Sequence, residues 1–255
     1  ANLREAHLEG AELYRTHLEG VYLRKAHLGG ASLRKAIFDS NTSFDGVSLE
    51  NEEQGCALIA DVNWNGMNIT NVNWMQIKML GDDSRALQLK LWKEEVRNAT
   101  EQVSDYQRAV RANRQLAAIL QGQGLNEEAA RFSYHAQKLQ RVVLRRQKKF
   151  GQYLFSGFLD LLAGYGYRPG RSVIWYLVTI LGFALAYFSI GHLPFFPDAF
   201  VFSLTSFHGR GFFPGLGTEN SLHNPLVVTA AFEAVIGLLI EISFIATFTQ
   251  RFFGR

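Results

Sequence analysis

The chain has 255 residues, a formal net charge of +3 and one cysteine, Cys56. The single cysteine excludes an intramolecular disulfide, and the length excludes several large domains within one chain. The average composition hides a division, because the sequence is polar and densely charged before about residue 150 and has long apolar runs after it. We therefore expect the two halves to face water and lipid respectively. Since the sequence starts at Ala1 in phase with a repeat, we also expect further residues before it.

The first module repeats every five residues. Eight consecutive units over residues 1–40 have Leu or Phe at the third position and Ala, Val or Thr at the first. The phase resumes after one extra residue, Asn41, and continues to about Gln76, with one failing unit at residues 52–56. A period of five fits neither an α-helix nor an alternating strand, but it suits a square coil with one unit on each side. The large third residue and the small first residue would then point inward.

This pattern resembles the pentapeptide-repeat family, which implies a right-handed quadrilateral β-helix over residues 1–80. With four units in each coil, residues 20 apart stack, which places His7 beside His27. A metal site is one interpretation of that pair, but we favour a solvated face. The outward charges have mixed signs, which argues against the mimicry of DNA found in some members of the family. We expect a scaffold or sensor surface with no metal, no cofactor and no nucleic-acid partner.

Residues 81–149 predict a helical connector. Asp83 or Ser84 is placed to cap a first helix, the glycines at 122–124 break it, and Asn126 is placed to cap a second helix. The pair resembles a single tetratricopeptide-like hairpin. We interpret it as a spacer and a contact between subunits.

A run of basic residues follows in the second of these helices: Arg131, Lys138, Arg141, Arg145, Arg146, Lys148 and Lys149. No acidic residue lies between Glu128 and Asp160. Because this run precedes apolar sequence, we favour contact with anionic lipid headgroups over contact with nucleic acid. Residues 150–168 are apolar and aromatic but too mixed to span a bilayer, so they predict a helix lying in the membrane interface.

Two segments predict transmembrane helices. Ser172–Ile190 contains no charged residue and would be about 28 Å long as a helix, close to one hydrocarbon thickness. Pro225–Gln250 is apolar except for two glutamates. Basic residues lie before the first span and after the second, whereas the loop between them has only Arg210. This asymmetry predicts a multi-pass protein of the cell (inner) membrane with both termini cytoplasmic.

The loop at residues 191–224 is far longer than a turn needs, and it is aromatic where a solvated loop would be polar. Pro197 and Asp198 favour the start of a short helix that ends near Phe207. A glycine-flanked segment follows it. Irregular backbone at membrane depth survives only when it is buried in protein or lines water. This order of elements therefore predicts a re-entrant pore loop.

Residues 150–255 resemble the two-transmembrane potassium-channel-like family, particularly its prokaryotic members with pentapeptide repeats ahead of the pore. The resemblance rests on GYGYRPGR before the first span, FSLTSF as a pore helix, G-x-G as a filter, and the pair of Glu233 and Gly237 in the second span. It implies a pore domain over residues 169–255, with the order helix, pore loop, helix. It also implies a homotetramer with the pore on the fourfold axis.

The implied filter and pore-loop residues are Ser206, Phe207, His208, Gly209, Arg210, Gly211 and Phe212. From Phe207 to Phe212 these stand where potassium channels have Thr, Val, Gly, Tyr, Gly and Asp. A cation replaces the aromatic residue and the acidic residue is lost, so potassium selectivity does not follow from the resemblance.

Three ionisable residues leave alternatives open. Arg210 either points into the pore, which would favour anions, or lies behind the filter paired with Glu233, which we favour because an unpaired charge in a membrane is costly. His208 either senses pH or packs the loop, and we favour packing. Glu241 either lines the inner pore or bonds a neighbouring helix. Gly237, between the two glutamates, is a candidate bend point.

These observations together predict a homotetrameric membrane ion channel that conducts cations rather than anions. Its predicted partners are further copies of the chain, membrane lipid and the permeant inorganic ions. The alternative is a membrane-anchored scaffold or binding module that does not conduct. We expect no enzyme, because the sequence offers no nucleophile–base set, no metal-spaced cluster and no phosphate-binding loop.

Overall fold

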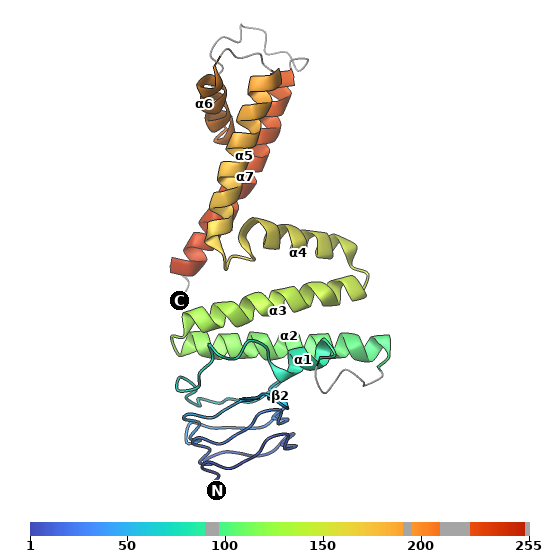
Figure 1. The fold of residues 1–255 in the computed structure, drawn as a ribbon, viewed down its shortest axis with the longest axis vertical. Coiled ribbons are helices and arrows are strands. Elements are labelled where there is room, and N and C mark those ends of the chain that lie inside the picture. The colour runs from blue at the N-terminus through green and yellow to red at the C-terminus, as the bar shows by residue number, and fades with distance from the viewer. Residues whose placement is uncertain (90–96, 191–194, 210–224, 253–255) are drawn as a thin grey trace. The chain divides into compact units, whose positions relative to one another are not determined.

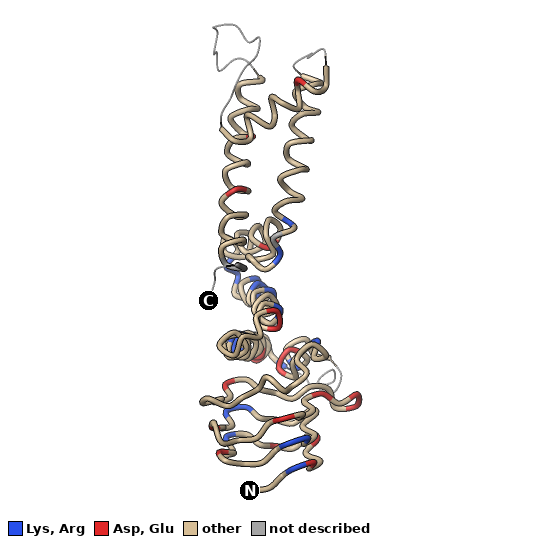
Figure 2. Tube along the Cα trace, turned by 90° about the vertical axis from the view of Figure 1, so that its left-hand side faces the viewer, with Lys and Arg blue, Asp and Glu red and all other residues tan. Residues whose placement is uncertain are grey.

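The computed structural model describes residues 1–89, 97–190, 195–209 and 225–252. The chain forms two compact units, Ala1–Leu154 and Phe155–Arg255. Lys, Arg, Asp and Glu are dense in the first unit and sparse along the long helices of the second (Figure 2). The division in composition therefore coincides with a division in structure.

The first unit begins with stacked coils of backbone (Figure 1). Parallel bridges join Asn2 to Tyr22, His7 to His27, Glu12 to Ser32 and His17 to Ile37. The spacing of 20 residues is four units of five, as the stacking of His7 on His27 required. It becomes 21 for the Tyr22–Ser43 bridge, because Asn41 is accommodated, and 26 for the Ser32–Leu58 bridge.

The failing repeat unit explains the larger spacing. It leaves the coil as a small antiparallel hairpin of β1 (Glu50–Asn51) and β2 (Gly55–Cys56), in which Glu50 pairs with Cys56. The coil then resumes in phase. A unit that cannot place a large apolar residue inward is thus looped out without disturbing the stack.

The coil interior is built from the two inward positions of the repeat. The third-position residues Leu23, Leu28 and Leu33 are fully buried, and so are the first-position residues Ala26 and Ala31 between them. Each buried leucine stabilises the fold by about 1.5–3 kcal/mol relative to an exposed one. The alternation of large and small side chains lets successive coils approach closely enough to bond.

The described residues after the coils form the helices α1 (Gly81–Ala86), α2 (Ala99–Gly122) and α3 (Asn126–Arg146). Helix α2 lays Leu116 and Leu120, both fully buried, into the same core as the coils. Phe132 of α3 packs edge-on against Trp74, with ring centroids 6.3 Å apart. The hairpin of α2 and α3 therefore closes the apolar end of the stack (Figure 1).

The predicted start of the first connector helix is wrong. Helix α1 ends at Ala86, and α2 begins at Ala99, where Asn98 accepts a hydrogen bond from the Glu101 N–H and so caps the helix. Asp83 lies instead in the first turn of the short α1, where its side chain accepts from the Leu80 N–H at 3.0 Å. It is buried and also accepts from the Asn113 side chain at 2.7 Å, so it joins α1 to α2.

An ion pair at the coil surface gives a pH-dependent prediction. Arg111 of α2 donates to both oxygens of Asp61, at 2.9 and 3.1 Å, and this pairing lowers the pKa of the carboxyl. We expect Asp61→Asn, which tolerates the positive φ of this position, to cost about 0.5–1 kcal/mol at neutral pH. Stability from a lowered carboxyl pKa is lost as pH falls through that pKa. Thermal unfolding of both chains should therefore converge in acid, and a gap independent of pH would contradict the assignment.

The second unit is helical. Helix α4 (Phe150–Ala163) crosses the boundary into it, followed by α5 (Pro169–Ile190), α6 (Phe196–Phe207) and α7 (Pro225–Phe252). Two stretches, Gly170–Ile190 and Pro225–Thr249, are long and apolar enough to cross a membrane, with mean hydropathies of 2.1 and 2.0. Only 22% of each apolar window is buried within the protein, unlike the core helix of a soluble domain. The short α6 packs against both (Figure 1).

Candidate functional site: the junction of α5, α6 and α7

Three polar side chains meet inside the apolar second unit. Glu233 of α7 accepts a hydrogen bond from the Tyr187 hydroxyl of α5 at 2.6 Å and is bonded to the Ser203 hydroxyl of α6 at 2.5 Å. All three residues are fully buried. A carboxyl group in a membrane protein is costly without partners, and here it has one from each of the other two helices. Glu233 therefore joins α5, α6 and α7 at one point.

The sequence of α6 places its side of this junction. Pro197 stands in the first turn and Asp198 beside it, where a fixed φ and a negative charge both favour a helix start. The buried residues recur with helical spacing, on one face: Ala199, Phe202, Ser203, Ser206 and Phe207. This face is mainly apolar, so Ser203 and Ser206 are buried with it. Of these two residues, Ser203 is the one bonded to Glu233.

The end of α6 is held by a second group of contacts. The His208 Nδ1 lies 2.5 Å from Glu241 Oε1 of α7, and its Nε2 lies 3.4 Å from the Tyr176 hydroxyl of α5. Phe207 is buried and packs edge-on against Tyr176, with ring centroids 4.9 Å apart. Gly209 then adopts a φ of +66°. Contacts with α5 and α7 therefore fix the position of the end of α6.

Gly237 allows α7 to approach this end of α6. A methyl group at Gly237 would overlap the carbonyl oxygen of Phe207. Helix α7 runs through Gly237 as one helix from Pro225 to Phe252, so the glycine serves close packing in this structure.

Adding that methyl group gives a prediction. We expect Gly237→Ala to destabilise the contact of α6 with α7 by about 1–3 kcal/mol through overpacking. Gly182 of α5 is the matched control, because a methyl group there meets nothing within 4 Å. Thermal melting of the purified membrane protein should drop for Gly237→Ala and stay or rise slightly for Gly182→Ala. Equal melting of the two variants would show that the close approach does not matter.

The structure brings together most of the sequence-predicted site. Ser206, Phe207, His208 and Gly209 lie at the end of α6, and Glu233, Gly237 and Glu241 lie along α7. Arg210, Gly211 and Phe212 lie outside the described residues.

Sequence reasoning missed Tyr187, Ser203 and Tyr176. Each is a single polar or amphipathic residue within an apolar helix, and such a residue usually hydrogen-bonds when buried. That rule identifies candidates, but it does not say that Tyr187 and Ser203 meet the same carboxyl group.

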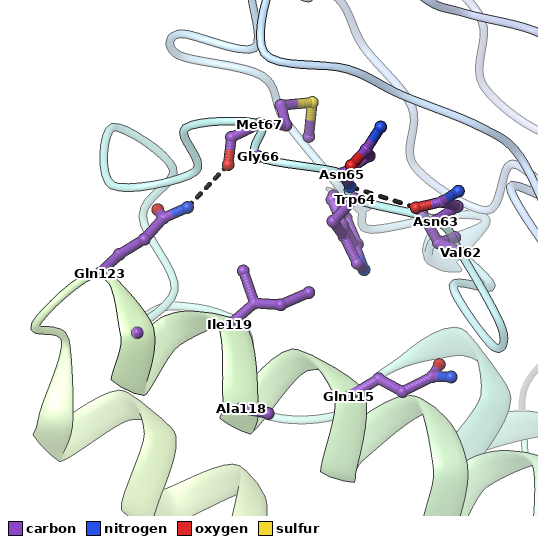
Figure 3. A pocket seen from close by; sticks show the side chains of 11 residues that line it. Val62, Asn63, Trp64, Asn65, Gly66, Met67, Gln115, Ala118, Ile119 and Gln123 are labelled. Carbon is purple, nitrogen blue, oxygen red and sulfur yellow. Dashed lines mark hydrogen bonds between the residues drawn. The ribbon is translucent and has the colours of Figure 1, made fainter. Parts of the chain in front are cut away.

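The first unit contains a pocket of about 530 Å³ between the last coils and α2 (Figure 3). Trp64, Met67 and Ile119 contribute its apolar side chains. Two amides at its edge already bond the coils: Gln123 Nε2 donates to the Met67 carbonyl at 2.7 Å, and Gln115 Oε1 accepts from the Asp61 N–H at 3.0 Å. We interpret the pocket as a gap in the seam where α2 docks.

The stacked histidines of the coils lie on an exposed face. The rings of His7 and His27 are 4.8 Å apart and nearly parallel, and His7 Nδ1 is 3.1 Å from Glu9 Oε1. Across the described residues, no three His, Cys, Asp or Glu side chains gather closely enough to hold a metal ion.

Comparison with known proteins bears on the first unit. Residues 1–39 match the family model described as pentapeptide repeats, in 8 copies. The N-terminal coils are pentapeptide repeats, and such repeats imply a β-helix. No curated protein and no solved structure matches the chain. The family match does not reach the membrane unit, so the resemblance of that unit to potassium channels stays a prediction.

Proposed function

We propose that the protein is a homotetrameric membrane ion channel whose cytosolic pentapeptide repeats form a right-handed quadrilateral β-helix. The observation that carries the proposal is the position of α6. This helix of 12 residues lies between two membrane-length helices in sequence and is joined to both by the buried Glu233. A simple anchor needs no such helix.

The geometry at the end of α6 supports a pore. His208 and Gly209 lead out of α6 while held against α5 and α7, so the glycine-containing segment starts within the helical unit. Backbone that is neither helix nor closed sheet needs protein or water around it at membrane depth. One chain provides only part of such an enclosure, and symmetric assembly of several chains completes it.

Charge favours cations in this proposal. The side chain of Glu241 is 36% exposed beside His208, so a ring of four such carboxylates would face the space next to the filter and attract cations. Arg210, in our proposal, lies behind the filter and pairs with Glu233. This arrangement keeps its positive charge away from the ions.

The alternative is a membrane-anchored repeat protein without conduction, with which the repeats and two apolar helices are equally compatible. The two functions differ in assembly. We expect the protein in lipid nanodiscs to have a native mass of four chains. A single chain, or an assembly without fourfold symmetry, would favour the anchored scaffold.

A further inference from the structure

The looped-out hairpin of the repeat unit, residues 50–56, is called the strap below and is fitted closely to the coils. A methyl group at Gly29 or at Gly30 would overlap atoms of the strap. One coil away, a Cβ at Gly10 would lie 2.6 Å from the side-chain oxygen of Gln54, which belongs to the strap. The backbone of Gly29 has no positive φ, so its missing side chain serves this close approach. The strap therefore has a fixed place across two coils.

The strap presents only negative charge. Its charged side chains are Glu50, Glu52 and Glu53, all of them exposed, and it contains no Lys or Arg. The chain bridges at Ser48 on the second side of the coil before the strap, and at Leu58 on the third side after it. The three carboxylates are therefore held at the corner between these two sides.

The next corner of the same coils is basic. Arg15 of the first coil and Lys35 of the second are exposed and lie over the ring of Tyr14, 5.1 and 5.9 Å from its centroid. We call these three residues the basic corner. In the described part of the chain neither cation forms an ion pair, and the acid of the third coil, Asp61, is already bonded by Arg111. An anion from outside the chain would relieve the repulsion between the two stacked cations.

The two corners suit contact between copies of this chain. The basic corner lies between the third side, which bridges at Glu12, and the fourth side, which bridges at His17. In a coil of four sides it is a quarter turn from the strap, and both surfaces lie over the first two coils. With parallel coil axes, a copy rotated by a quarter turn brings its strap to its neighbour's basic corner. Four such head-to-tail contacts close a ring.

We propose that the strap of one copy binds the basic corner of the next copy, so that the repeat units form a ring of four. This inference rests on the proposed fourfold assembly, but it does not depend on whether the protein conducts ions. An exposed contact between a few charges is weak alone. Chains that are held in one assembly meet at a high effective concentration, which lets such contacts form.

Disulfide cross-linking of the full chain tests the proposal. A chain with Lys35→Cys and Glu53→Cys is reconstituted in lipid nanodiscs and oxidised, and the masses of the denatured, unreduced products are measured. Arg15 and Glu52 still attract each other across the contact in this variant, and the native Cys56 is buried. We expect a ladder of covalently joined chains that ends at four.

The matched control is a chain with Lys25→Cys and Glu53→Cys. Lys25 occupies the same repeat position in the same coil as Lys35, is also exposed and has a φ of +57° against +58°. It lies at the other corner next to the strap, where Glu5 is 3.8 Å from it and balances its charge. We therefore expect several-fold less cross-linked product from this control.

Reversing one charge separates attraction from chance collision. Arg15→Glu, added to the chain with cysteines at 35 and 53, should lower the yield several-fold, and Glu52→Lys should then restore it. The repeat accepts glutamate at this position, because Glu5 occupies it with a φ of +56°.

Equal yields from the two cysteine pairs would overturn the proposal. So would the absence of product in a particle whose native mass is four chains, and both results would leave the channel proposal standing. A native mass other than four chains would instead contradict the fourfold assembly on which both proposals rest.

Discussion

Replacing Asp82 with Ala is expected to cost about 3–5 kcal/mol, because it leaves a charge buried without its partner. Asp82 is fully enclosed beneath the last coils and accepts from Arg34 at 2.8 Å. It also accepts from the backbone N–H groups of Ile59 and Ala60, at 2.6 and 2.9 Å. The carboxylate therefore accepts hydrogen bonds from a guanidinium and two backbone N–H groups that are buried away from water.

Hydrogen exchange measures this effect locally, which avoids treating a two-unit chain as a single folding unit. Exchange at Ile59 and Ala60 should rise by about a hundredfold or more in Asp82→Ala. Asp82→Asn keeps an acceptor oxygen, so its exchange rates at Ile59 and Ala60 should lie between those of the native chain and those of Asp82→Ala. Glu52→Ala, at an exposed position in the looped-out repeat unit, is the control and should change little. Unchanged exchange in Asp82→Ala would show that the Asp82 carboxylate does not hold the last coils in place.

Replacing Glu233 with Ala is expected to abolish conduction and weaken assembly. The change leaves the buried Tyr187 hydroxyl without its acceptor, at about 1–3 kcal/mol, and removes the bond between Ser203 and α7, although the Ser203 hydroxyl keeps the Ile180 carbonyl at 2.9 Å. Tyr187→Phe removes the bond to Glu233 but keeps the carboxyl group in place, and should cost about 1 kcal/mol. Thr229→Val is the control, since that hydroxyl donates to the Pro225 carbonyl of its own helix at 2.7 Å. Native mass and single-channel current are the measurements.

Glu233→Gln tests the pairing proposed for Arg210. Glutamine keeps an acceptor for Tyr187 but removes the charge, so a paired Arg210 would be left buried and unpaired. We expect current to fall in Glu233→Gln and to recover in part when Arg210→Gln is added. Native current in Glu233→Gln alone would contradict the pairing and favour an Arg210 that faces the pore.

The repeat was predictable from sequence because its physics is local and periodic. Each five-residue unit has a large residue at its third position and a small one at its first position, and one arrangement of the chain buries both. The two interruptions of the repeat were also visible in the sequence. Asn41 and the unit at 52–56 change the bridge spacing from 20 to 21 and then to 26 residues. The two long apolar helices α5 and α7 were equally predictable, because the number of residues in an apolar run determines whether a helix is long enough to cross a membrane.

The remaining contacts depend on packing that no local pattern encodes. Asp83 was expected to cap a helix that starts near Arg85, whereas the structure places it in the first turn of the short α1, where it accepts from the Leu80 N–H and from Asn113, 30 residues away. Ser203 was visible as part of a short helix, yet its pairing with Glu233 depends on how α6 turns against α7. Gly237 was expected to bend a helix, whereas its small size is used where the Phe207 carbonyl approaches.

Ion conduction is tested most directly by the reversal potential of a reconstituted current. The purified full chain would be reconstituted in a planar bilayer under a KCl gradient, and the reversal potential of its current measured. We predict a current that reverses toward the potassium equilibrium potential, as expected when Glu241 faces the ion path and Arg210 does not. Reversal at the chloride potential would contradict the assigned charge selectivity. Absence of current, in a particle without fourfold symmetry, would contradict the channel itself and leave a membrane-anchored repeat protein.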